Sequence, residues 1–155
     1  MKMPVLLLYI LSFSSVLLTG CEYFKNREIK AAGTDLIMEQ IGGTLDQEQS
    51  TVIHGLNTRG KDFTKYVQNH TEIKVLNLTE VTANDYFLET KIHTISPIIR
   101  QMILEMLAKM DSRTANAFNF ANAMGLIHQE KPDIEIEVEQ NLSIEVHNKN
   151  GKWVK

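Results

Sequence analysis

The chain has 155 residues, 16 lysines and arginines against 19 aspartates and glutamates, a net charge of −3 and one cysteine. This length suits a single domain of ordinary size. A mildly acidic chain without a basic run or stripe is not expected to bind nucleic acid, and a single cysteine excludes a disulfide within the chain.

The first segment has the three parts of an export signal. A basic start at Lys2 precedes an apolar stretch from Val5 to Leu18, and small residues follow it. The stretch is shorter than the roughly 20 apolar residues that a spanning helix needs, and the charged residues Glu22 and Lys25 follow at once. The pattern favours a removable export signal over a permanent transmembrane helix.

The end of this segment, Leu18-Thr19-Gly20-Cys21, resembles the lipobox of bacterial lipoproteins, in which an aliphatic residue, a small residue and Gly or Ala precede a lipid-bearing cysteine. The resemblance implies cleavage between Gly20 and Cys21, attachment of a diacylglyceryl group to the Cys21 thiol, and Cys21 as the mature amino terminus. The next residue is Glu22 rather than the Asp that commonly retains lipoproteins in the inner membrane. In a bacterium with two membranes, this implies the periplasmic face of the outer membrane.

A lipid on Cys21 also accounts for the solitary cysteine. Exported proteins meet an oxidising environment in which disulfides persist, yet Cys21 has no second cysteine to pair with. The alternative is an incidental cysteine near the end of an ordinary signal peptide. Because one acyl chain binds a membrane reversibly and two chains bind it stably, we expect a diacylated Cys21 to hold the protein on the lipid bilayer.

Residues 21–33 are expected to form a lipidated tether, and residues 34–155 a single domain. Tyr23 and Phe24 follow the lipid closely, where aromatic rings suit the headgroup boundary; a disordered spacer is the alternative. Helices are predicted over 34–41, ended by Gly42-Gly43, over 46–56 and over 61–68.

Two strands are predicted next, over 73–82 and 86–95, because both segments are rich in β-branched and apolar residues and a turn-forming segment separates them. In the second strand apolar residues and threonines alternate with Glu89, Lys91 and His93. One face of this strand pair is therefore expected to be buried and the other wet.

The strongest helix is predicted to begin at Ser96-Pro97, with serine as cap and proline at the first helical position. Its apolar residues recur at helical spacing, at Ile98, Ile99, Met102, Ile103, Met106, Leu107 and Met110. Asp111-Ser112 is expected to break or bend it, and a helical segment over 114–124 to follow, closed by Gly125.

Asn116, Asn119 and Asn122 recur at every third position of that segment, so they would form a slanted polar row on a helix. The row is a candidate contact for a partner protein or a polar ligand. A solvated face of an alanine-rich helix is the alternative that we favour.

The last region, from Ile134 to Val146, alternates strictly between apolar even positions and polar odd positions, which predicts one long strand. Asn150-Gly151 is a strong signal for a two-residue hairpin, and its register pairs Asn148 with Trp153. The odd-numbered acids of the strand form a negative stripe that we interpret as a solvated face.

These elements together predict an α+β fold in the order helices, strand pair, long helix and carboxyl-terminal antiparallel strands, with one antiparallel sheet packed against the long helix. The terminal hairpin and its tryptophan faintly resemble the end of NTF2-like lipoprotein domains, which cup a ligand in a curved sheet. The element order differs from that family, because a strand pair precedes the long helix here.

No catalytic motif is present, and the five histidines, at 54, 70, 93, 128 and 147, lack ligand spacing. We therefore expect no enzyme, cofactor or metal. The leading hypothesis is a non-catalytic interaction module of the cell envelope, acting as an accessory subunit, an inhibitor or an exclusion factor. The alternative is a module that binds a small ligand or a peptidoglycan fragment; a large apolar cavity would favour it, and a filled core with an exposed apolar patch would favour a protein partner.

Overall fold

The computed structural model describes residues 4–52 and 57–155, and it describes side chains for residues 22–49, 59–111 and 113–155. The elements follow one another as α1 (Pro4–Val52), α2 (Asn57–Asn69), β1 (Glu72–Thr82), β2 (Asp85–Ile95), α3 (Pro97–Ala108), α4 (Ser112–Asn116), α5 (Phe120–Glu130), β3 (Glu137–Lys149) and β4 (Lys152–Val154). The strands form one antiparallel sheet in the order β1-β2-β3-β4. The predicted α+β class is confirmed.

Helix α1 is one continuous helix of 49 residues, so the prediction of separate helices over 34–41 and 46–56 is wrong; residues 53–56 lie outside the described part. The pair Gly42-Gly43 does not end the helix. Instead Gly42 lies where α2 crosses α1, and a Cβ atom there would be 2.8 Å from Nε2 of Gln68. Packing against α2 thus overrides the weak helix propensity of glycine.

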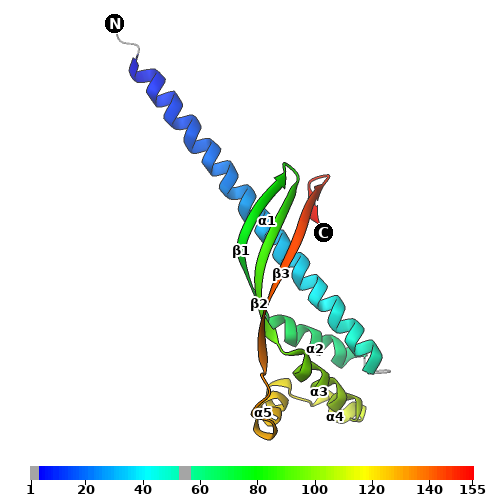
Figure 1. The fold of residues 1–155 in the computed structure, drawn as a ribbon. Helices are drawn as coiled ribbons and strands as arrows, with labels where there is room; N and C mark the ends of the chain where they lie inside the picture. The colour runs from blue at the N-terminus through cyan, green and yellow to red at the C-terminus, as the bar shows by residue number, and fades with distance from the viewer. Residues whose placement is uncertain (1–3, 53–56) are drawn as a thin grey trace.

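The segment expected to be a tether, residues 21–33, is also helical and belongs to α1. Ile29 within it is fully buried against the sheet. The folded domain therefore begins before residue 34, and Figure 1 shows α1 running along the sheet and then projecting beyond it toward the amino terminus.

The apolar face of the sheet is covered by α1. The prediction that the helix starting at Pro97 covers it is wrong, although the alternation predicted for β2 is confirmed by its burial pattern. We call the buried residues between α1 and the sheet the sheet cluster; they are Ile29, Ile37, Tyr86, Leu88, Ile92, Ile144 and Val146. Gly33 lies directly over Leu88, where a Cβ atom would be 2.4 Å from the Leu88 Cδ2, so α1 approaches β2 closely.

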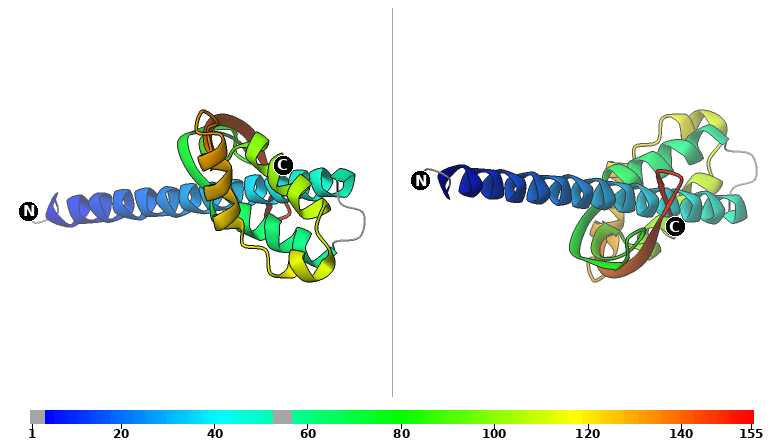
Figure 2. Two further views of the ribbon diagram at one scale, coloured as in Figure 1. Left: turned by 90° about the horizontal axis from the view of Figure 1, so that it is seen from below. Right: turned by 90° about the horizontal axis from the view of Figure 1, so that it is seen from above.

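A second core, the helical cluster, lies at the other end of the sheet between α1, α2, α3, α4 and α5. It consists of Leu45, Phe63, Val67, Ile95, Ile99, Ile103, Leu104, Leu107, Ala115, Phe120, Ala123 and Ile127. Figure 2 shows α2, α3 and α4 beside the carboxyl-terminal part of α1, whereas α5 lies further from α1, next to α3 (Figure 1). Ile41 on α1 packs against both clusters, so the two cores are continuous.

The helix predicted at Ser96-Pro97 is confirmed as α3, and a break does occur near Asp111. The predicted helix over 114–124 is wrong, because α4 ends at Asn116 and α5 begins at Phe120. Asn119 accepts a hydrogen bond from the backbone N–H of Asn122 at 3.0 Å and so caps α5. Gly125 lies inside α5 rather than closing a helix.

Strand β3 and the terminal hairpin follow the sequence pattern. The strand begins at Glu137, later than predicted, and its even positions 144 and 146 are buried. Asn150 and Gly151 both have positive φ, 54° and 79°, as a type I′ turn requires. Asn148 pairs with Trp153 in the expected register, and the Trp153 ring meets Tyr86 edge to face at 5.6 Å.

In the part of the chain that the structure describes, no helix combines the length and the apolar character needed to cross a membrane.

Candidate functional site

The predicted lipidation site lies where α1 leaves the sheet. The backbone of Leu18, Thr19, Gly20 and Cys21 is helical, and their side chains lie outside the described set. Lys25, one turn further on, reaches the β1–β2 turn, where its Nζ lies 3.4 Å from the carbonyl oxygen of Ala83. The start proposed for the mature chain is thus level with that turn.

Lys25 also contacts the first residue of the buried face of β2. Its Nζ lies 5.0 Å from the centre of the Tyr86 ring, a cation–π distance. Hydrogen bonding to Tyr86 raises the pKa of Lys25 above its usual value. The first turns of α1 after Cys21 are therefore held against the sheet.

The turn between β1 and β2 and the turn between β3 and β4 both lie at this same end of the molecule (Figure 1). The backbone N–H of Asn148 donates to the carbonyl oxygen of Asn84 at 2.8 Å, which joins the β1–β2 turn to the end of β3. Tyr23 and Phe24 are each 67% exposed, and their rings meet edge to face at 6.0 Å. We call the surface formed by Tyr23, Phe24 and these two turns the anchor end.

The opposite end carries a groove between α3 and α5, with a cavity of about 320 Å³. We call it the distal groove; its lining residues are Met102, Glu105, Met106, Lys109, Leu126, Ile127 and Glu130. Leu126 is 55% exposed. Methionine side chains are flexible and adapt to varied partners, so the groove has an adaptable apolar floor with charges around it.

Beneath the groove the core is filled. Ile99, Ile103 and Leu107 on α3 are fully buried in the helical cluster. The sequence pattern of Met102 and Met106 indicated a helix face, but the groove could not be located without knowing that α5 starts at Phe120 and packs beside α3.

The three asparagines proposed as a polar row are divided between two elements. Asn116 ends α4, Asn119 is the cap of α5, and Asn122 lies in the first turn of α5. The prediction of a row on one helix is therefore wrong, and the Asn119 side chain is used in capping. All three residues are exposed, and their contact with a partner stays a prediction.

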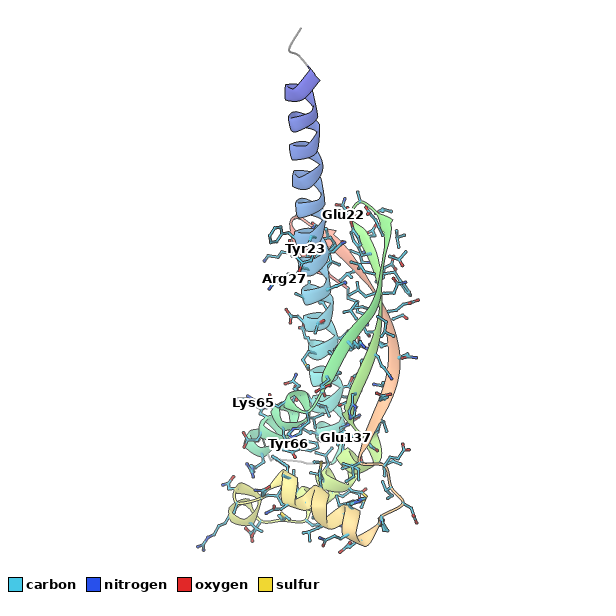
Figure 3. The ribbon with its side chains drawn as sticks, turned by 90° about the vertical axis from the view of Figure 1, so that its left-hand side faces the viewer. Glu22, Tyr23, Arg27, Lys65, Tyr66 and Glu137 are labelled. Atoms are coloured by element: carbon cyan, nitrogen blue, oxygen red, sulfur yellow. The ribbon has the colours of Figure 1, made fainter. Side chains whose placement is uncertain are left out.

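A polar cavity of about 290 Å³ lies where α2 meets the sheet, lined by Asn69, His70, Glu72, His93 and Glu137. His93 Nε2 lies 2.8 Å from Oε2 of Glu137. Figure 3 shows Tyr66 of α2 and Glu137 of β3 at this level of the molecule. The lining residues are mostly exposed, so this is a shallow surface feature.

Tyr66 contacts His70, one of the residues that line this cavity. Its ring stacks on His70 at 4.2 Å between centres, and its hydroxyl group is buried without a hydrogen-bond partner among the described residues. Burial, assisted by the negative charge of Glu137, raises the pKa of Tyr66.

The histidines on the two ends of the sheet are kept apart. His93 faces Glu137, whereas His147 Nδ1 lies 2.8 Å from Oδ1 of Asp85 near the β1–β2 turn. Among the residues with described side chains, no group of three or more His, Cys, Asp or Glu could hold a metal ion.

The acids on the outer face of β3 are partly neutralised by neighbouring β2. Glu139 Oε2 lies 2.6 Å from Nζ of Lys91, and this hydrogen bond lowers the pKa of Glu139 below its ordinary value. Glu137 pairs with His93. The acids expected to form a negative stripe are therefore partly paired with Lys91 and His93 of β2.

No protein family, curated protein or solved structure matches the chain.

Proposed function

We propose that the protein is a bacterial envelope lipoprotein, anchored in the bilayer through a diacylated Cys21, that acts as a non-catalytic interaction module. The observation that carries the proposal is that Leu18-Thr19-Gly20-Cys21, which resembles a lipobox, is located at the point where α1 leaves the folded domain. In a bacterium with two membranes, Glu22 favours the periplasmic face of the outer membrane. An accessory subunit, an inhibitor and an exclusion factor all fit this architecture.

In this proposal α1 is a stalk rather than a flexible tether. From Cys21 to Val52 the helix rises by about 45 Å at roughly 1.5 Å per residue. Ile29 and Ile37 attach it to the sheet, and Leu45 attaches it to the helical cluster. A lipid at Cys21 would therefore hold the distal groove far from the bilayer surface (Figure 1).

The distal groove is the surface that we assign to a protein partner. Met102, Met106 and Leu126 form an apolar floor, and Glu105 and Lys109 supply charges of both signs beside it. Such a groove suits the apolar face of an amphipathic helix. An apolar patch above a filled core favours a protein partner over a small ligand.

The alternative, a ligand module with an NTF2-like cupped sheet, has less support. The sheet face that would enclose a ligand is covered by α1, with Leu88, Ile92 and Val146 buried beneath it. The cavity between α1 and the strands is about 150 Å³, smaller than the 300–1,000 Å³ that is typical of ligand pockets.

The anchor is tested by replacing its thiol. We expect Cys21→Ser to abolish incorporation of a labelled fatty acid and to leave the protein unprocessed or free of the membrane fraction, because no other cysteine can carry the lipid. Glu22→Asp is the matched control: it should keep the label and move the protein toward the inner membrane. Unchanged processing and membrane association of Cys21→Ser would overturn the lipoprotein assignment.

The partner surface is tested by placing a charge in the distal groove. We expect Leu126→Glu to weaken capture of a stoichiometric envelope partner by about tenfold or more, because interface centres tolerate buried charge poorly. Leu76→Glu on β1 is the control, since Leu76 is 53% exposed and Leu126 is 55% exposed. Equal capture by both variants, or no stoichiometric partner for the wild type after cross-linking, would contradict this assignment.

A further inference from the structure

We propose that the anchor end lies directly on the bilayer, with the β1–β2 and β3–β4 turns in contact with the phospholipid headgroups. This inference rests on the lipid anchor proposed above and deepens it, because it identifies a second contact with the same membrane. The domain would then contact the bilayer with its anchor end, instead of being connected to it through the lipid alone.

The distance from the lipid to the domain is the first argument. Cys21 and Lys25 are separated by about 6 Å along a helix that rises roughly 1.5 Å per residue, and Lys25 is already in contact with Ala83 in the β1–β2 turn. A lipid in the membrane at residue 21 therefore brings this turn to the headgroup layer. No flexible segment of the described mature chain separates the two.

The second argument is that the anchor end has a broad base. The Asn148–Asn84 hydrogen bond of 2.8 Å joins the end of β3 to the β1–β2 turn, and Trp153 of β4 donates from Nε1 to Glu28 of α1 at 3.3 Å. Figure 3 shows Tyr23 on the side of α1 that faces away from the sheet. Tyr23 and the β1–β2 turn thus lie on opposite sides of the helix axis, which resists tilting.

The third argument is the chemistry of the surface. Tyr23 and Phe24 are the two most exposed large apolar side chains of the described residues, at 67% each, and Val81 next to the β1–β2 turn is 58% exposed. Aromatic rings are favoured at the membrane interface. Lys149 and Lys152 flank the other turn, and Glu22 and Glu80 lie at the same end, so aromatic burial rather than net charge supplies the attraction.

The outer face of the sheet is less suited than the anchor end to contact the membrane. It carries the ion pair of Lys91 with Glu139 and the hydrogen-bonded pair of His93 with Glu137, and these polar groups would lose water if that face lay on lipid. The end-on orientation buries the exposed aromatic rings and leaves those pairs in water.

The experiment measures depth with a spin label on the full-length, lipidated protein in phosphatidylethanolamine–phosphatidylglycerol vesicles. Because acylation consumes the only native thiol, a cysteine introduced at Ala83→Cys or at Lys131→Cys is the only one that reacts. Lys131 is the control, since it is exposed at the end of α5. We expect a label at residue 83 to be several-fold less accessible to a water-soluble nickel chelate than a label at residue 131.

The aromatic contribution is measured in the same assay. Tyr23→Ser combined with Phe24→Ser should keep the lipid and make the label at residue 83 more accessible, whereas Leu76→Ser on β1 should leave its accessibility unchanged. Circular dichroism checks that each variant is folded. An unchanged depth in the double variant would overturn the role of the rings.

The possible failures are distinguishable by mass spectrometry of the same samples. A chain without the diacyl mass overturns the proposed function and this inference together. A lipidated chain whose residue 83 is as accessible as residue 131 overturns the inference alone. A label at residue 83 that is protected only in native envelopes, and not in vesicles, shows that a protein covers the anchor end, and also overturns it.

Discussion

Asp85 shows how a single side chain joins the strands at the anchor end. It follows the β1–β2 turn and accepts hydrogen bonds from the Thr82 hydroxyl and from His147 Nδ1, the latter at 2.8 Å. The hydrogen bond from Thr82 and then that from His147 lower the pKa of Asp85 below its ordinary value of 3.8. The carboxylate therefore connects β1, β2 and β3 in its charged form.

This pKa shift makes a prediction about acid stability. A group whose pKa is depressed by folding stabilises the protein above its unfolded pKa and loses that contribution as the pH falls through the folded value. We expect Asp85→Asn to lower the urea midpoint at pH 7 and to lower it less at pH 3. Asp133→Asn, an exposed residue in the loop before β3, is the control. An Asp85→Asn deficit that is the same at both pH values would contradict the linkage.

The close approach of α1 to β2 is decided at the scale of whole elements. Gly33 is buried between them, with Leu88 Cδ2 where a Cβ would need to be, whereas nothing lies within 4 Å of a Cβ at Gly43 on the same helix. Gly33 is therefore needed for packing, whereas Gly43 on the same helix neither packs against another element nor ends the helix.

The two glycines provide a matched pair of substitutions. Alanine stabilises a helix interior by about 0.5–1 kcal/mol relative to glycine, so Gly43→Ala should raise the free energy of unfolding by that amount. At Gly33 the same gain is opposed by overpacking, which costs about 1–3 kcal/mol, so Gly33→Ala should lower it by about 1 kcal/mol. Urea denaturation measures both, and a stabilising Gly33→Ala would show that Leu88 can move aside.

Elements whose signals are local were predictable from the sequence. The alternation in β2, the proline start of α3 and the Asn150-Gly151 turn all act within a few residues. The boundary between α4 and α5 was not predictable from the sequence. The spacing of Asn119 also fits a helix face, whereas in the structure its side chain caps α5. Asparagine suits both positions, and only the chain's path distinguishes them.

At the scale of the whole molecule, α1 joins the two cores into one unit. Ile41 packs against the sheet cluster and against the helical cluster, and the intervening length of α1 is uninterrupted. Unfolding either core would expose apolar surface of the other, so the protein should unfold cooperatively.

We therefore expect a single unfolding transition. Fluorescence of Trp153, which packs on the sheet cluster, and the helical circular dichroism signal should give the same urea midpoint. Ile41→Ala should lower both midpoints together, with a cost of about 2 kcal/mol, the lower end of the range for isoleucine truncation. Separate midpoints for the two probes would mean that the cores unfold independently.

The sequence by itself determined the α+β class, the strand alternation, the terminal hairpin and the resemblance to a lipobox, because periodicity, turn residues and short motifs operate over neighbouring positions. Only the tertiary structure decided that α1 is one helix, that it rather than α3 covers the sheet, and that Met106 and Leu126 meet in one groove. These features depend on packing between residues far apart in the chain, and such packing overrides the local signal of a glycine pair.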